Sequence, residues 1–105
     1  MARRLVRRRQ AERDLGEQVE YIARERPAAA RRYLIAVEDA FRRLVQMPEM
    51  GVPRTFDDPR LAGLRVWPVP GFRRFLIFYR VTTNTVDVVR VLHSARDVPR
   101  ALDGE

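Results

Sequence analysis

Two apolar runs separated by a polar break dominate the C-terminal half of the chain. They are residues 75–81 and 86–93, both rich in aromatic and β-branched side chains, and four polar residues lie between them. Side chains of this kind favour pleated strands, and a short polar loop between two such runs is typical of a β-hairpin. The pattern therefore predicts a β-hairpin that the rest of the chain covers or extends.

The register of this hairpin decides which side chains share a face, because a slip of one residue exchanges the two faces. If the loop places Val81 opposite Val86, Arg80 faces Asp87, and we expect a cross-strand ion pair that favours this register. One face then carries Phe75, Ile77, Tyr79, Val81, Val86, Val88 and Leu92, and the other carries Leu76, Phe78, Val89, Val91 and His93.

Helical spacing of apolar residues precedes the hairpin in the sequence. One stripe is Ala11, Leu15, Val19 and Ile22, with Glu12, Asp14, Glu17, Glu20 and Arg24 on the opposite face, and a second stripe is Tyr33, Leu34, Val37, Phe41, Leu44 and Val45. The first helix must end before Pro27, because the residue before a proline is driven out of the helical region. Pro27 itself suits the first turn of the second helix. Two helices joined by so few residues form an antiparallel hairpin.

The remaining segments complete the order of elements. Residues 2–8 hold two apolar residues between arginines, as suits a charged edge strand. Residues 47–63 contain three prolines and predict an irregular connection, whereas residues 64–67 alternate as a short strand that Pro68 should limit. The sequence predicts one α+β domain over residues 1–105, in the order β-α-α-β-β-β: an N-terminal edge strand, a two-helix antiparallel hairpin and a three-stranded antiparallel sheet.

Both faces of the predicted hairpin are apolar, but two helices suffice to cover only one side of a small twisted sheet. Something else must cover the second face. The candidates are the chain's own tail, residues 98–105, a second copy of the chain, or a different partner. An exposed apolar patch of this kind usually marks an interaction site.

Composition narrows the class of protein. The 105 residues include no cysteine and a single histidine, which argues against thiol catalysis, disulfides and a metal site built from these residues. The sequence has no signal peptide and no apolar run of about 20 residues, so we expect a soluble cytoplasmic protein without membrane association. The formal net charge is +7, and all 21 basic residues are arginine. Such a surface should attract a polyanion or an acidic protein.

The order of short motifs resembles a known family. The chain combines Tyr21-Ile22-Ala23 in the first helix, Pro27-Ala28-Ala29 at the start of the second, a break at Pro48 and Gly51, Ile77-Phe78-Tyr79-Arg80, and Val89-Arg90-Val91-Leu92-His93 followed by Arg96-Asp97. This arrangement, over nearly the whole chain, resembles the ParE branch of the RelE/ParE toxin superfamily. The resemblance implies a toxin of a type II toxin–antitoxin module, as in plasmid stabilization systems, that an acidic-tailed antitoxin neutralises by wrapping its surface.

Two mechanisms occur within this superfamily. The resemblance to the ParE branch implies inhibition of DNA gyrase by binding, whereas the RelE branch cuts messenger RNA in the ribosome. Two of the polar RelE nuclease positions correspond here to Leu76 and Leu102, and Arg96 matches a basic one. Without the others there is no acid–base pair. We therefore expect a gyrase inhibitor without catalytic residues, metal or cofactor, with a ribosome-dependent endonuclease, or a basic interaction protein that has lost toxicity, as alternatives.

His93, Arg96 and Asp97 are the candidates for contact with the target. His93 titrates near neutrality and could act as a base, or it could bond a neighbouring backbone group at the end of its strand. Arg96 and Asp97 could contact the target, or they could fix the chain where it leaves the strand. The residues by themselves leave both roles open.

Five residues are candidates for contact with the antitoxin: Arg4, Trp67, Leu76, Phe78 and Arg80. Phe78 belongs to the hairpin face that the helices leave uncovered. Trp67 could anchor a partner or close the helix–sheet core as an aromatic lid. Arg4 and the neighbouring arginines could meet antitoxin carboxylates or nucleic acid. We expect the toxin to form a hetero-oligomer with its antitoxin.

Overall fold

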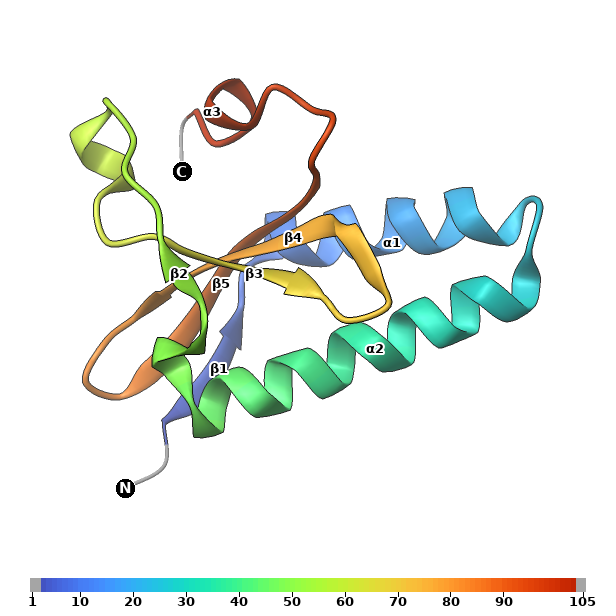
Figure 1. Cartoon of the computed structure of the whole chain (residues 1–105), viewed down its shortest axis with the longest axis horizontal. Helices are drawn as coiled ribbons and strands as arrows, with labels where there is room; N and C mark the ends of the chain where they lie inside the picture. Colours follow the sequence, from blue (N-terminus) through green and yellow to red (C-terminus); the bar gives the residue numbers. More distant parts are fainter. Residues whose placement is uncertain (1–2, 104–105) are drawn as a thin grey trace.

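Five strands form a single sheet in the computed structural model, which describes residues 3–103 (Figure 1). The strands are β1 (Arg4–Arg7), β2 (Val52–Pro53), β3 (Arg65–Val69), β4 (Phe72–Val81) and β5 (Thr85–His93), in the spatial order β1-β5-β4-β3-β2. β1 runs parallel to β5, and the other neighbouring pairs are antiparallel. The predicted α+β fold with its N-terminal edge strand is confirmed, but the sheet has one strand more than predicted.

The extra strand, β2, lies in the stretch that the sequence predicted to be irregular. It pairs with the first two residues of β3, and two residues are too few to show the alternation that marks a strand. β3 itself continues through Pro68 to Val69, further than predicted. Within the described residues β2 pairs with β3 only as far as Val66. Pro68 lies beyond this paired part, so the backbone N–H that proline lacks is not required by a strand on that side of β3.

Two antiparallel helices cover one face of the sheet, as predicted. α1 (Arg9–Ala23) ends just before the connection to α2 (Pro27–Gln46), and Pro27 occupies the first turn of α2 (Figure 1). A short third helix, α3 (Val98–Ala101), and two 3₁₀ turns, Pro48–Met50 and Pro59–Leu61, complete the described elements.

The helix-covered core follows the predicted stripes with one exception. Its buried residues are Ala11, Leu15, Tyr33, Val37, Ala40, Phe41, Leu44, Val69, Ile77, Tyr79, Val86, Val88 and Val91, with Val19, Ile22, Phe75 and Trp67 packed against them. Leu34 was predicted to join them, but its side chain is 40% exposed. Successive residues of an α-helix are rotated by about 100° around its axis. Leu34 follows the fully buried Tyr33 and therefore lies at the edge of the apolar stripe.

A bulge in β5 changes which hairpin residues share a face. The predicted pairing of Val81 with Val86 is confirmed, but the register shifts between Tyr79 and Phe78. Tyr79 pairs with Val88, whereas the neighbouring Phe78 pairs with Arg90. Val89 is therefore an extra residue on β5, and side-chain parity is inverted beyond it. As a result Val91 and His93 lie on the helix side, and Leu92 lies on the second face, the reverse of the prediction.

The predicted ion pair between Arg80 and Asp87 is wrong, although the two residues lie opposite each other. Asp87 instead accepts hydrogen bonds from Arg8, with 2.7 Å between Arg8 Nη2 and Asp87 Oδ2. Arg80 donates to the carbonyl oxygens of Ala62 and Arg60, at 3.1 and 2.5 Å. Arg80 therefore holds the connection before β3 against the sheet.

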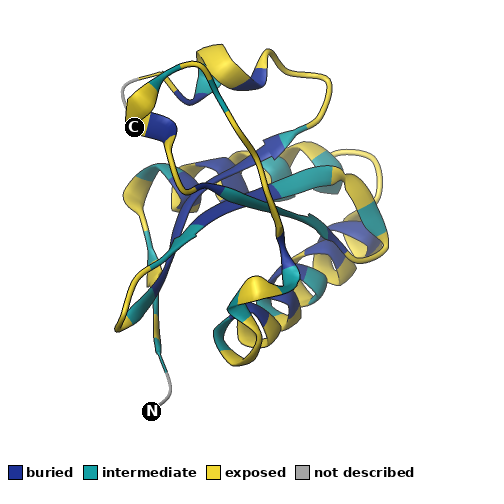
Figure 2. Cartoon of the chain, turned by 60° about the vertical axis from the view of Figure 1, so that its left-hand side comes forward, coloured by how far each residue is buried: buried dark blue, intermediate teal, exposed yellow. Residues whose placement is uncertain are grey.

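The chain itself covers the second face of the sheet. We call the buried residues there the second-face cluster: Leu61, Leu64, Phe78, Val89, Leu92, Val98 and Leu102. They come from β4, β5, the connection before β3 and the C-terminal segment around α3, and Figure 2 shows buried residues running along the strands between the two coverings. Of the predicted candidates the tail is right, but it shares the task with the connection, and Arg60 joins the two through Asp103 at 3.1 Å.

Tyr79 locks the start of that connection to the core. Its hydroxyl donates to the Pro48 carbonyl at 2.7 Å and accepts the Gly51 N–H at 2.8 Å. Burial raises the pKa of Tyr79, so the hydroxyl keeps the proton that it donates. A Cβ atom at Gly51 would lie 2.3 Å from the Tyr79 hydroxyl oxygen, which is too close without movement of the ring or the backbone.

Gly51→Ala is therefore expected to lower the free energy of unfolding by about 1–3 kcal/mol, the usual cost of overpacking. Gly16→Ala is the matched control, because Gly16 lies within α1 with nothing near the added atom. It should raise stability by about 0.5–1 kcal/mol through helix propensity. Urea titrations of both variants test this, and equal stability of the two would refute the close contact.

Candidate functional site

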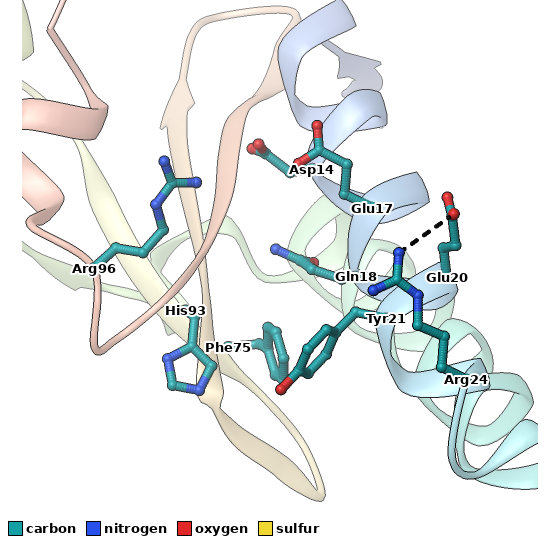
Figure 3. Close-up of a pocket in the computed structure, with 9 residues that line it drawn as sticks. All are labelled: Asp14, Glu17, Gln18, Glu20, Tyr21, Arg24, Phe75, His93 and Arg96. Carbon is teal, nitrogen blue, oxygen red and sulfur yellow. Dashed lines mark ion pairs between the residues drawn. The ribbon is translucent and has the colours of Figure 1, made fainter.

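A groove of about 630 Å³ opens between α1 and the ends of β4 and β5 (Figure 3). We call it the α1 groove. It is lined by Asp14, Glu17, Gln18, Glu20 and Tyr21 from α1, by Arg24 at the C-cap of that helix, by Phe75 from β4, by His93 at the end of β5 and by Arg96 just beyond it. Positions 14, 17, 18, 21 and 24 recur at helical spacing, so they share one side of α1.

His93 is held in place by two local contacts. Its Nδ1 accepts the backbone N–H of Ala95 at 3.0 Å, and its ring meets the Phe75 ring edge-to-face with 5.0 Å between the centroids. An accepting Nδ1 carries no proton, so in the neutral ring the proton resides on Nε2. His93 therefore offers the groove a donor and a ring face, and its Nδ1 is already engaged.

Arg96 and Asp97 follow in the exposed loop between β5 and α3. Asp97 is the N-cap of α3, and its carboxylate accepts the Arg100 N–H at 3.4 Å. The backbone N–H of Arg96 donates to the His93 carbonyl at 3.0 Å, and the Arg96 guanidinium extends toward the groove (Figure 3). Asp97 thus shapes the loop, while Arg96 is the member of the predicted pair whose side chain reaches the groove.

A buried ion pair beneath the groove was missed by the sequence analysis. Asp14 was predicted to face water, but it is 4% exposed and binds Arg90 through two contacts, Oδ2–Nε at 2.8 Å and Oδ1–Nη2 at 2.9 Å. Asp14 also accepts the Val91 N–H at 3.1 Å, and Arg90 donates from Nη1 to the Ala101 carbonyl at 2.5 Å. The pair therefore joins α1, β5 and the C-terminal segment. A lone arginine inside an apolar strand was the one signal that could have revealed it.

A second polar chain supports the wall of the groove. Gln18 donates from Nε2 to the Val91 carbonyl at 2.8 Å and accepts the Tyr33 hydroxyl at 2.6 Å. Burial, with a smaller contribution from the Asp14 charge, raises the pKa of Tyr33 and keeps this hydroxyl protonated. Tyr33 also packs on the ring of Phe75, with 4.9 Å between centroids. These contacts hold α1 at a set distance from the sheet.

The five residues predicted to contact an antitoxin do not form one surface. Phe78 is fully buried in the second-face cluster, so it is not available for contact and the prediction that a partner covers it is wrong. Leu76 and Arg80 are half-buried beside it, and the half-buried Trp67 packs on the helix-covered core with its indole N–H enclosed. Arg4 is exposed on β1, and two strands separate β1 from the strand that carries Trp67.

Residues 3–103 carry neither a cluster of metal ligands nor a helix that could span a membrane. These residues hold no group of three or more histidine, aspartate or glutamate side chains placed to bind a metal ion. In this part of the chain, no helix has both the length and the apolar character that crossing a membrane requires.

The comparisons with known proteins agree with one another on the fold. The sequence model described as the ParE toxin of the type II toxin–antitoxin system parDE matches residues 5–98. Among solved structures, the chain is similar to one described as the chromosomal ParDE TA system from P. aeruginosa, with 19% identity and a TM-score of 0.72 over 88% of this chain and 96% of that one. The search of curated proteins found no match.

Asp14→Asn should lower the free energy of unfolding by about 3–5 kcal/mol, because it removes the carboxylate that pairs with the buried Arg90 guanidinium. Glu17→Gln, one turn further along α1 and exposed, serves as the control and should change stability by no more than about 0.5 kcal/mol. Denaturant titrations measure both. Equal stabilities would mean that the Asp14–Arg90 pair does not hold the layers together.

Proposed function

The chain belongs to the ParE toxin family of type II toxin–antitoxin systems, and we propose that it inhibits DNA gyrase by binding and is neutralised by a cognate antitoxin. The observation that carries this proposal is the family match over residues 5–98, which spans the helix hairpin and the sheet except for Arg4, the first residue of β1. The proposed site of action is the cytoplasm, and the proposed functional form is a hetero-oligomer with the antitoxin.

Binding without catalysis is supported by what fills the second face of the sheet. Leu102 is fully buried in the second-face cluster, and Leu76 packs against that cluster. These are two positions where the nuclease branch would present polar groups. His93 lies on the helix side of the sheet, and its Nδ1 already accepts the Ala95 N–H. Leu76 and Leu102 therefore supply no groups for proton transfer to and from a message at the two positions where the nuclease branch would use them.

The proposed antitoxin surface is the exposed, arginine-rich edge at β1. Arg4 is exposed there, and the chain carries a net charge of +7, so an acidic antitoxin would be drawn to this edge. Trp67, Leu76 and Arg80 remain proposed contacts at the other strands. Phe78 is buried and does not belong to this surface.

The proposed target surface comprises His93, Arg96 and Asp97. Arg96 is exposed and directed toward the α1 groove, as a side chain that contacts a partner must be. His93 supports this loop by accepting the Ala95 N–H, and Asp97 supports it by capping α3. Within this set we therefore assign direct contact to Arg96 and positioning of the loop to Asp97.

Arg96→Ala is expected to weaken inhibition of gyrase by about tenfold or more in a supercoiling assay, the loss typical of a central arginine at an interface. Arg31→Ala, an exposed arginine on α2, removes the same charge elsewhere and should leave inhibition unchanged. Messages on translating ribosomes should stay intact with the wild-type protein. Cleavage of ribosome-bound message by the pure protein, abolished by Arg96→Ala, would replace gyrase inhibition by ribonuclease activity.

Arg4→Glu is expected to slow association with the antitoxin several-fold at low salt, with the difference shrinking as salt screens the charges. Stopped-flow or surface-based kinetics at two ionic strengths measure this effect. Arg31→Glu carries the same charge change on α2 and should slow association less. An Arg4→Glu association rate equal to that of the Arg31→Glu control would exclude the β1 edge from the antitoxin interface.

A further inference from the structure

The α1 groove has an aromatic end that no structural contact explains. Tyr21 is 68% exposed, although it lies on the same side of α1 as the buried Asp14 and the half-buried Gln18. Tyr21 and Phe75 both line the groove (Figure 3), and the Phe75 ring packs against the rings of Tyr33 and His93. A rigid aromatic floor therefore carries one exposed tyrosine at its rim. Tyrosine concentrates binding energy at interfaces because it offers a large apolar ring with a polar tip.

The charges around the groove balance, unlike those of the whole chain. Asp14 is neutralised by Arg90, and Glu20 lies 3.7 Å from Arg24. Two side chains then remain without an oppositely charged partner among the described residues, Glu17 on the helix wall and Arg96 on the opposite wall. The walls thus present one negative and one positive group across an aromatic floor.

We propose that the α1 groove is the docking site for the toxin's protein target, with Tyr21 as its central anchor. This inference rests on the proposed function, because it extends the surface around Arg96 onto α1. The partner segment that fits the groove places an apolar side chain between Tyr21 and Phe75. It turns a carboxylate toward Arg96 and a basic group toward Glu17.

This chemistry distinguishes the target from the antitoxin. The groove carries no net charge that would attract an acidic antitoxin tail, and Glu17 would repel it, so the arginine-rich β1 edge is its better partner. A folded protein surface with both charges and an apolar residue suits the groove. The volume of about 630 Å³ is enough for a few side chains, which matches docking of a short segment.

The test uses the full chain carrying Tyr21→Ala, Glu17→Arg or Ile35→Ala. Ile35 is the matched control, because it is 56% exposed on α2 and does not line the groove. Three measurements are made on each variant: growth inhibition on induction in cells, affinity for purified gyrase and for the purified antitoxin, and the urea midpoint. Tyr21→Phe is added as the conservative variant that keeps the ring.

Tyr21→Ala and Glu17→Arg are expected to lower growth inhibition and gyrase affinity about tenfold or more, with the antitoxin affinity and urea midpoint unchanged. Tyr21→Phe should restore most of the loss, and Ile35→Ala should match the wild type. If Tyr21→Ala lowers the urea midpoint, its loss of activity does not separate binding from folding. The result for the exposed Glu17→Arg variant then tests the inference.

Three results would overturn the inference. Wild-type growth inhibition by Tyr21→Ala and Glu17→Arg would remove the groove from the target interface. A tenfold loss of antitoxin affinity alone would assign the groove to the antitoxin instead. A wild-type protein that neither inhibits growth nor binds gyrase would overturn both proposals, whereas one that inhibits growth through Tyr21 without binding gyrase would overturn only the choice of gyrase.

Discussion

Apolar side chains on both faces of β4 and β5 are the constraint on which the rest of this structure depends. Exposed to water, either face would cost about 25 cal/mol for each Å² of apolar surface. The helix hairpin covers one face, and the connection before β3 joins the C-terminal segment to cover the other. In a chain of 105 residues, almost every element outside the sheet therefore packs on one of its two faces. The α1 groove lies at a rim of this arrangement, where the helix covering ends and the loop after β5 emerges.

The Asp14–Arg90 pair lies where the two coverings meet. Asp14 belongs to the helix layer, Arg90 to strand β5, and the Ala101 carbonyl that Arg90 also binds belongs to the C-terminal segment. A charge buried without its partner is costly, so each layer is acceptable only with the other in place. The α1 groove opens directly beside this pair, and Asp14 is part of its wall. The geometry of the groove is therefore a consequence of how the core is assembled.

Polar residues near the groove differ in whether they bond the local backbone or extend away from it. His93 and Asp97 bond the backbone around them, and they give the loop after β5 its shape. Arg96, Glu17 and Tyr21 extend outward from the two walls that this framework sets apart (Figure 3). Such outward side chains contribute little to the core, so they can be changed without disturbing the sheet.

Local spacing along the sequence was sufficient to predict the two long helices, four of the five strands, their order and the register beside the hairpin turn, but not β2 or α3. Apolar periodicity and the geometry of Pro27 act between near neighbours, so they can be recognised without the fold. The bulge at Val89, the burial of Phe78 and the pairing of Asp14 with Arg90 were decided by the tertiary structure. Asp14 and Arg90 are 76 positions apart, and nothing adjacent to Asp14 distinguishes it from the exposed carboxylates of α1. The α1 groove arises only when helix, strand end and loop converge, because a concave surface is a property of elements packed together.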